Sequence, residues 1–184
     1  MRALRVSYVG EFGYELHMPM DAMQAVYQKL LEAGAPHDIG HYGLYAANSM
    51  RLEKGYRGWG SDLTTERSPI EAGLAPFCRN RDHPAWHVID QRPNDWEMVL
   101  IEIPSDDCHP FYAHTLLQDD RPIGVITSAA YGYRTQKMLA LAYLRDPAAR
   151  ENLQAEILGQ LYPVRILTQP PFDPQNNRLR HGGQ

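Results

Sequence analysis

Cysteine is scarce in this sequence, and so are long apolar runs. The 184 residues include two cysteines, Cys78 and Cys108, too few for the disulfide framework of a secreted scaffold. No apolar run approaches the roughly 20 residues of a membrane-spanning helix, and the N-terminus has no continuous apolar stretch like that of a signal peptide. We therefore expect no membrane partner and a cytoplasmic location.

Positive charge is not in excess either, because 18 Lys and Arg residues face 22 Asp and Glu residues, for a net charge of −4. The basic cluster at residues 178–181 stands alone, so we expect no nucleic-acid partner. The absence of a G-x-G-x-x-G loop after a strand indicates that this chain holds no FAD domain. His83 and His87 have helical metal-ligand spacing, but Pro84 intervenes and no further ligands complete a set, so we predict no metal.

The N-terminal pattern predicts a β-hairpin. Apolar residues alternate from Ala3 to Met18 on either side of a central segment, Gly10-Glu11-Phe12-Gly13. The two glycines permit positive φ, so we expect a tight tip that holds the Glu11 carboxylate in place.

Helical periodicity follows the hairpin. Asp21 has the character of an N-cap, and apolar residues recur at helical spacing until Gly34. A second helix is predicted from Tyr42 to Lys54, with Gly55 as its stop. Ser68 and Glu71 match a capping box, which predicts a short helical turn.

Residues 79–95 combine scattered charges with two prolines, which is typical of a connector. Beyond them come short β-type runs, which predict a small antiparallel barrel. The predicted strands are Met98–Ile103, Ile123–Thr127, Met138–Leu144, Leu153–Leu158 and Tyr162–Thr168. We therefore predict an α+β fold with two domains, residues 1–80 and residues 81–184.

Two groups of residues suggest ligand chemistry. Glu11 on the hairpin tip and Glu15 offer acceptors for an N–H-rich ring, and Arg51 can bind a carboxylate through two hydrogen bonds. The alternative is a solvated turn carboxylate and an ordinary helix salt bridge. The segment Gly55–Gly60 places Trp59 among glycines, which suits stacking on a flat ligand or, alternatively, a connector whose aromatics fill the core. Thr127 and Ser128 have no His and Asp beside them in sequence that would mark a nucleophile.

Several motifs resemble a known family in the family's own order. The segment Val6–Leu16, VSYVGEFGYEL, resembles the hairpin of the glycine-cleavage T-protein (aminomethyltransferase) family, and residues 49–55 resemble its helix ending. Residues 51–63 and 68–74 are most similar to the folate-binding C-terminal region of sarcosine and dimethylglycine dehydrogenases. Residues 122–132, 140–144 and 171–174 continue the resemblance, which therefore covers nearly the whole chain and corresponds to the family's C-terminal part.

The resemblance implies a partial folate-binding α/β core followed by a small antiparallel β-barrel. Its cofactor would be tetrahydrofolate, with 5,10-methylenetetrahydrofolate as product. Carried over to this sequence, Glu11 would hydrogen-bond the pterin, Tyr8 would line the pocket, and Arg51 would help hold the folate tail or orient the site. The other cofactor-binding candidates are Glu15, Trp59 and Arg178. Catalytic residues stay unassigned.

The resemblance also has a gap, because family members carry a segment before this hairpin that supplies an acidic residue, and we find no counterpart. The chain opens at Met1 inside a predicted strand, so we expect a fragment, a truncated product or one subunit of a pair. Its first domain should expose an apolar face, which predicts self-association or a partner chain that supplies the missing half.

The function expected from the resemblance is tetrahydrofolate-dependent one-carbon transfer from a glycine-derived or N-methyl amine donor. Two alternatives stay open. One is a non-catalytic remnant that binds a ligand or partner. The other is a folate-dependent demethylase of the same superfamily.

Overall fold

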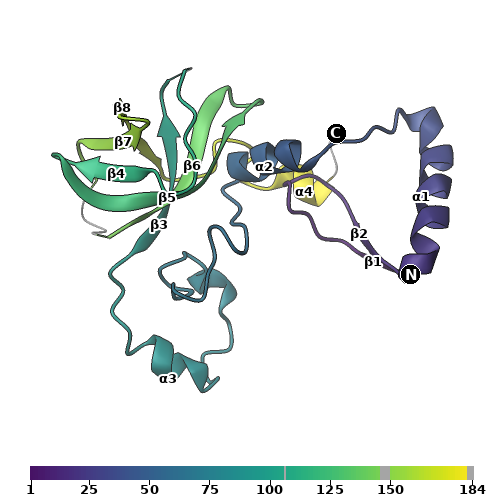
Figure 1. The fold of residues 1–184 in the computed structure, drawn as a ribbon. Coiled ribbons are helices and arrows are strands. Elements are labelled where there is room, and N and C mark those ends of the chain that lie inside the picture. The colour runs from purple at the N-terminus through teal and green to yellow at the C-terminus, as the bar shows by residue number, and fades with distance from the viewer. Residues whose placement is uncertain (106, 146–149, 182–184) are drawn as a thin grey trace.

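The computed structural model of the protein describes all residues except 106, 146–149 and 182–184. Figure 1 shows a curled β-sheet, an arm that extends from it and carries the N-terminus, and a small lobe around α3. Helix α2 lies where the arm joins the sheet. Among the described residues, no helix is both long enough and apolar enough to cross a membrane.

The arm begins with the predicted hairpin, whose paired part is shorter than expected. Strands β1 (Arg2–Leu4) and β2 (Glu15–His17) pair antiparallel, with Leu4 opposite Glu15. The tight tip predicted at residues 10–13 is wrong, because the whole of residues 5–14 forms the connection. Pairing stops early because the loop folds toward α2: Gly10 has a φ of +74°, and the Lys54 side chain occupies the space that a Cβ there would need.

Helix α1 (Met20–Gly34) follows, but its ends differ from the prediction. The N-cap is Pro19, and Asp21 lies in the first turn. Gly34 keeps a helical φ of −85°, so the chain continues into the 3-10 helix η1 (Ala35–His37). The left-handed residue that ends this unit is Asp38, with a φ of 55°.

Helix α2 (Leu44–Glu53) ends as predicted, at a glycine with positive φ. Gly55 has a φ of +64°, its N–H bonds the carbonyl of Leu52 at 2.9 Å, and the N–H of Tyr56 bonds the carbonyl of Arg51 at 2.8 Å. This pair of bonds is the Schellman motif, which satisfies carbonyls at the helix end.

The reciprocal bonds of the predicted capping box are also confirmed. The Ser68 N–H bonds Glu71 Oε2 at 2.8 Å, and the Glu71 N–H bonds Ser68 Oγ at 3.1 Å. Turns, not a regular helix, follow at residues 69–73. The 3-10 helix η2 (Ala75–Phe77) comes next, and the connector contains a short helix, α3 (Ala85–Ile89).

The curled sheet has seven strands, all paired antiparallel, in the order β8-β7-β4-β5-β6-β3-β9. Their bounds are β3 (Glu97–Ile103), β4 (Thr115–Gln118), β5 (Arg121–Gly132), β6 (Lys137–Leu144), β7 (Leu153–Ile157), β8 (Gln160–Pro163) and β9 (Arg165–Leu167). A short helix, α4 (Asn177–His181), closes the described chain.

The predicted α+β class with an antiparallel barrel is confirmed, with differences in its strands. The sequence pattern missed β4. The run predicted at 162–168 is divided between β8 and β9, which lie on opposite edges of the sheet. Val164 alone separates these two edge strands in sequence, so the sheet must curl until its edges approach each other.

The sheet buries residues on both faces. One cluster fills the inside of the curl, with Ile101, Leu116, Ile126 and Ala140 among its fully buried members. A second cluster lies outside the curl, where Leu52 of α2 packs with Leu139, Leu141 and Tyr143 of β6. This outer cluster fixes α2 on the sheet and so sets where the arm begins.

Candidate functional site

A cleft of about 400 Å³ lies between the β1–β2 loop and helix α2. Tyr8, Glu11 and Glu15 all line it, so the structure brings three of the predicted site residues to one place. The aromatic side chains of Phe12, Tyr14 and Tyr42 line the same cleft and are each substantially exposed. The cleft therefore offers both flat apolar surface and carboxylates.

Glu11 is held by two arginines that come from distant parts of the chain. Oε1 forms an ion pair with Arg134 in the β5–β6 turn, and Oε2 accepts a bond of 3.0 Å from Nε of Arg178 in α4. Burial acts to raise the pKa of the Glu11 carboxyl, but hydrogen bonds and charge from Arg178 and Arg134 outweigh it and lower the pKa. The carboxyl is therefore ionised at neutral pH and can only accept hydrogen bonds.

Phe172 lies against both of these arginines. The guanidinium carbon of Arg134 lies 4.7 Å from the ring centroid, and that of Arg178 lies 5.8 Å from it. Cation–π contact of this kind fixes a guanidinium without using its N–H donors. The donors of both arginines therefore stay directed at Glu11.

Arg51 belongs to a different, buried network. Its side chain is 4% exposed, and Nη1 donates to Oδ2 of Asp62 at 2.5 Å and to the carbonyl of Tyr56 at 2.9 Å. Nε and Nη2 both donate to Asn48 Oδ1, at 2.9 and 2.7 Å. Since its donors are used within the protein, Arg51 orders the end of α2, and its predicted contact with a folate tail stays untested.

Asp62 is the centre of that network and is fully buried. Besides Arg51, the N–H of Gly58 reaches Oδ2 at 2.8 Å. Oδ1 accepts from the hydroxyls of Thr127 at 2.5 Å and Ser128 at 2.6 Å. Neighbours on a strand normally face opposite sides, but a β-bulge between Ile126 and Ser128 brings these two hydroxyls to one oxygen.

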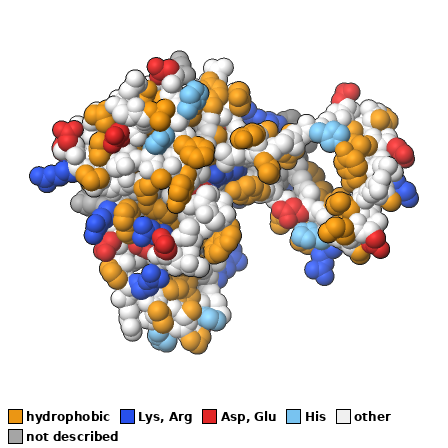
Figure 2. Space-filling model, viewed as in Figure 1, with side chains coloured by type: hydrophobic (Ala, Val, Ile, Leu, Met, Phe, Trp, Pro, Cys, Tyr) orange, Lys and Arg blue, Asp and Glu red, His pale blue; other side chains and the backbone are white. Residues whose placement is uncertain are grey.

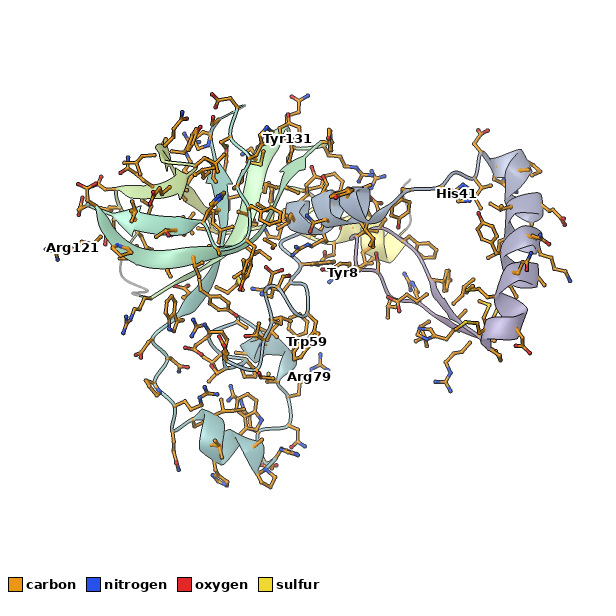
Figure 3. The ribbon with its side chains drawn as sticks, viewed as in Figure 1. Tyr8, His41, Trp59, Arg79, Arg121 and Tyr131 are labelled. Carbon is orange, nitrogen blue, oxygen red and sulfur yellow. The ribbon has the colours of Figure 1, made fainter. Side chains whose placement is uncertain are left out.

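The two remaining candidates, Trp59 and Glu15, are both exposed. Trp59 is 78% exposed and lines a separate cleft of about 100 Å³ with Arg67 and Tyr143. Glu15 lies on β2, exposed, with Oε2 3.4 Å from Nε2 of His17. The glycine loop does approach the first cleft, because a Cβ on Gly58 would lie 2.9 Å from the Tyr8 hydroxyl. Figure 3 labels Tyr8 and Trp59, which come from these two adjoining loops.

Sequence reasoning missed two residues that hold predicted site residues in place, Arg134, which pairs with Glu11, and Asp62, which pairs with Arg51. Arg134 lies in a β-turn, where polar residues are expected for other reasons, and nothing in the sequence pairs it with Glu11. Asp62 follows a glycine-rich loop, where an acidic residue suggests exposure, not burial. Within the described residues, no group of three or more His, Cys, Asp or Glu side chains is arranged to hold a metal.

Another cleft, with a volume of about 640 Å³, lies elsewhere. It lies between the Gly55–Arg57 segment, β3 and residues 166–170, and it is lined mainly by apolar side chains. None of the site residues predicted from the sequence lines it. We therefore place the candidate site at the smaller cleft, where carboxylate, arginines and aromatic rings converge.

Two family models match this chain, one over its N-terminal part and one over the curled barrel. The model of the GCVT N-terminal domain matches residues 1–82, and that of the glycine cleavage T-protein C-terminal barrel domain matches residues 97–173. The chain belongs to the glycine-cleavage T-protein family, as the motifs indicated. The boundary predicted between residues 80 and 81 stays a prediction.

Relatives in this family include both dehydrogenases and transferases. The chain is 32% identical over 193 residues to the mitochondrial dimethylglycine dehydrogenase of Mus musculus, covering 99% of this chain and 22% of that protein. It is 31% identical over 194 residues to the mitochondrial sarcosine dehydrogenase of Mus musculus, covering 98% of this chain and 21% of that protein. It is 30% identical over 190 residues to the aminomethyltransferase of Thermus thermophilus, covering 94% of this chain and 48% of that protein.

A solved structure shares the fold. The glycine cleavage system aminomethyltransferase T from Bartonella henselae superposes with a TM-score of 0.80 at 22% identity, over 94% of this chain and 50% of that chain. This chain thus spans about half the length of the aminomethyltransferases and about a fifth of the dehydrogenases that it matches.

Proposed function

We propose that this chain is a tetrahydrofolate-binding region that takes part in one-carbon transfer. The observation that carries the proposal is the Glu11 carboxylate, fixed by Arg134 and Arg178 beside a cleft of about 400 Å³ lined with aromatic rings. A reduced pterin is flat and presents several N–H donors along one edge. An ionised carboxylate and ring surfaces match both features.

In this proposal each residue has a separate task. Glu11 accepts hydrogen bonds from the N–H edge of the ring, and its two arginines keep it ionised and in place. Tyr8 and Phe12 provide the surfaces on which the ring lies. Bound tetrahydrofolate supplies the nitrogen atoms that take up the one-carbon unit.

The donor is proposed from the names of the relatives. Dimethylglycine dehydrogenase and sarcosine dehydrogenase are named for N-methyl amines, and the aminomethyltransferase is named for an aminomethyl group. We propose a donor of this class, an N-methyl amine or a glycine-derived aminomethyl group. Because this chain spans only part of these relatives, the proposal assigns it folate binding and assigns no catalytic residue.

Calorimetric titration with tetrahydrofolate tests the proposal. We expect saturable binding, and Glu11→Ala should weaken it by at least tenfold, since a hydrogen bond to a charged group is worth roughly 1.5–3 kcal/mol. Glu32→Ala, on an exposed turn of α1, is the matched control and should leave affinity unchanged. Absence of binding by the wild type, or equal affinity for wild type and Glu11→Ala, would contradict the proposal.

The exposed arm supports a second proposal, association through α1. None of the residues of α1 is buried, and Met23, Tyr27 and Leu30 share one exposed face at helical spacing. Figure 2 shows hydrophobic side chains along this arm. An apolar face of this kind is typical of an interface, so we propose that a second copy or a partner chain covers it.

Sedimentation velocity tests the self-association form of this proposal. The wild type should shift to a larger species as concentration rises, and Tyr27→Lys should weaken that shift. Gln28→Lys, on the other side of the helix, adds the same charge and should leave it unchanged. A wild type that stays monomeric at every concentration would reject association with itself and leave only a partner chain.

A further inference from the structure

Glu53, the last residue of α2, organises the β5–β6 turn that carries Arg134. Its Oε1 accepts from the N–H of Arg134 at 2.9 Å, the N–H of Thr135 at 2.8 Å and the Thr135 hydroxyl at 3.1 Å. Glu53 is 2% exposed, and Gly132 leaves room for it, since a Cβ there would lie 2.8 Å from Oε1. The buried Glu53 Oε1 therefore fixes the backbone of Arg134, one of the two arginines that pair with Glu11.

Lys54, the next residue, organises the segment that carries the other arginine. Its Nζ donates to the carbonyl of Asp173 at 2.5 Å and lies 3.2 Å from Asp173 Oδ2. The Asp173 carboxylate accepts the N–H groups of Asn177 at 2.8 Å and Arg178 at 3.2 Å, in the first turn of α4. Lys54 therefore holds the carboxylate that caps the helix of Arg178.

The Lys54 side chain also reaches the loop of Glu11 directly. A Cβ on Gly10 would lie 2.4 Å from Cγ of Lys54, so the lysine stem packs against the backbone just before Glu11. Consecutive residues on a helix point about 100° apart, which lets Glu53 reach the β5–β6 turn while Lys54 reaches the loop of Glu11 and Asp173. The two side chains thus contact every segment that meets at the Glu11 carboxylate.

We propose that Glu53 and Lys54 are a positioning pair for Glu11, Glu53 acting through Arg134 and Lys54 acting through Asp173 and Arg178. Neither residue touches the cleft, since neither lines it. The consequence for ligand affinity rests on the function proposed above, whereas the positioning itself is measurable without ligand. Absence of folate binding would therefore not contradict the positioning pair, and a failed positioning test would not contradict folate binding.

The test measures the pKa of the Glu11 carboxyl in the ligand-free chain by ¹³C NMR, assigned with Glu11→Gln. The charged groups that act on this carboxyl are Arg134 and Arg178, which lower its pKa against the opposing effect of burial. Glu53→Leu and Lys54→Met should each move the pKa upward, toward its ordinary value. Glu53→Gln keeps an oxygen where three donors converge and should leave the pKa nearly unchanged.

Double variants separate positioning from general stability. In an Arg134→Ala background, Glu53→Leu should have no further effect on the pKa of Glu11, whereas Lys54→Met should still raise it. In an Arg178→Ala background, Lys54→Met should have no further effect on the pKa of Glu11, whereas Glu53→Leu should still raise it. A loss of stability without specific positioning would instead give the same shift in every background, and that result would overturn the proposal.

A milder variant guards against misfolding of Glu53→Leu. Thr135→Val removes one of the three donors to Glu53 and leaves Glu53 in place, so it should raise the pKa of Glu11 by a smaller amount. In calorimetry, Glu53→Leu and Lys54→Met should each weaken tetrahydrofolate binding by a few fold, while Glu53→Gln should match the wild type. An unchanged Glu11 pKa in both Thr135→Val and Lys54→Met would exclude the positioning pair.

Discussion

At the scale of the residue, Asp62 joins the two parts of the molecule. Its carboxylate takes donors from α2, from the glycine loop and from β5, and its carbonyl accepts the Tyr143 hydroxyl at 3.0 Å. A buried carboxylate survives desolvation only when charge and hydrogen bonds compensate it, and here a buried arginine and three further donors do so. In this network the hydroxyls of Thr127 and Ser128 donate to the Asp62 carboxylate.

Replacing Asp62 by Asn should therefore strongly destabilise the fold. The change leaves the Arg51 charge buried without a partner and turns an amide NH₂ toward other donors, so the free energy of unfolding should fall by about 3–5 kcal/mol. Urea denaturation measures this. Asp90→Asn, which removes a carboxylate from an exposed pair with Arg81, is the control and should cost at most about 1 kcal/mol. Similar losses in both variants would contradict the central role of Asp62.

The buried Tyr143 hydroxyl should make the stability of the fold fall at alkaline pH. Burial raises the pKa of its hydroxyl to about 12; Arg67 opposes this, and the charges of Asp62 and Glu71 add to it. Because the pKa is raised on folding, the stability from the neutral hydroxyl is complete below pH 10 and is lost as pH rises from 10 to about 12. One proton corresponds to a slope of about 1.4 kcal/mol per pH unit in that window. In urea titrations Tyr143→Phe should show a shallower decline than the wild type, and parallel curves would contradict this assignment.

Sequence reasoning at this scale found residues whose signal is local. Glu11 stands between two glycines beside aromatic residues, a pattern readable from neighbours alone, and the structure gives it a defined place. Arg134 and Asp62 depend on partners far along the chain: Arg134 meets Glu11, and Asp62 meets Thr127. Those pairs follow from barrel closure and a β-bulge, which no short window of sequence encodes.

At the scale of the element, local chemistry decided what could be predicted. The capping box at Ser68 and the stop at Gly55 depend on adjacent residues and are confirmed. Strand β4 was missed because its Leu-Leu-Gln pattern does not alternate, and a register shift between Leu116 and Leu117 interrupts its pairing. The tight hairpin tip failed because strand pairing ends at Leu4 and Glu15, and the loop between them folds toward α2, where Gly10 packs against Lys54.

Gly124 of β5 shows such a tertiary requirement within the sheet. A Cβ there would lie 2.4 Å from the carbonyl oxygen of Tyr143, a backbone atom of the neighbouring strand β6. Gly124→Ala should therefore separate β5 from β6 and lower the free energy of unfolding by about 1–3 kcal/mol. Gly40→Ala meets no atom within 4 Å and should stay within about 0.5 kcal/mol of the wild type. Guanidinium denaturation of both variants makes the comparison, and equal midpoints would refute it.

At the scale of the whole molecule, stability is distributed unevenly. The barrel brings β8 and β9 to opposite edges of one sheet although only Val164 separates them, and its strands bury two hydrophobic clusters. The arm is different, because α1 buries none of its residues and packs mainly against η1. An isolated helix of 15 residues is marginal in water, so its persistence depends on whatever covers it.

Amide hydrogen exchange should therefore be fast in α1 and slow in the strands of the barrel. In dilute protein the amides of α1 should exchange orders of magnitude faster than those of β6, because α1 opens locally while β6 opens only with the barrel. If α1 is the interface between copies, raising the protein concentration should protect α1 and leave β6 unchanged, and Tyr27→Lys should abolish that protection. Mass spectrometry of peptides from both elements gives the comparison. Exchange in α1 as slow as in β6 at the lowest concentration would show that the arm is stable alone, and its exposed apolar face would then need no partner.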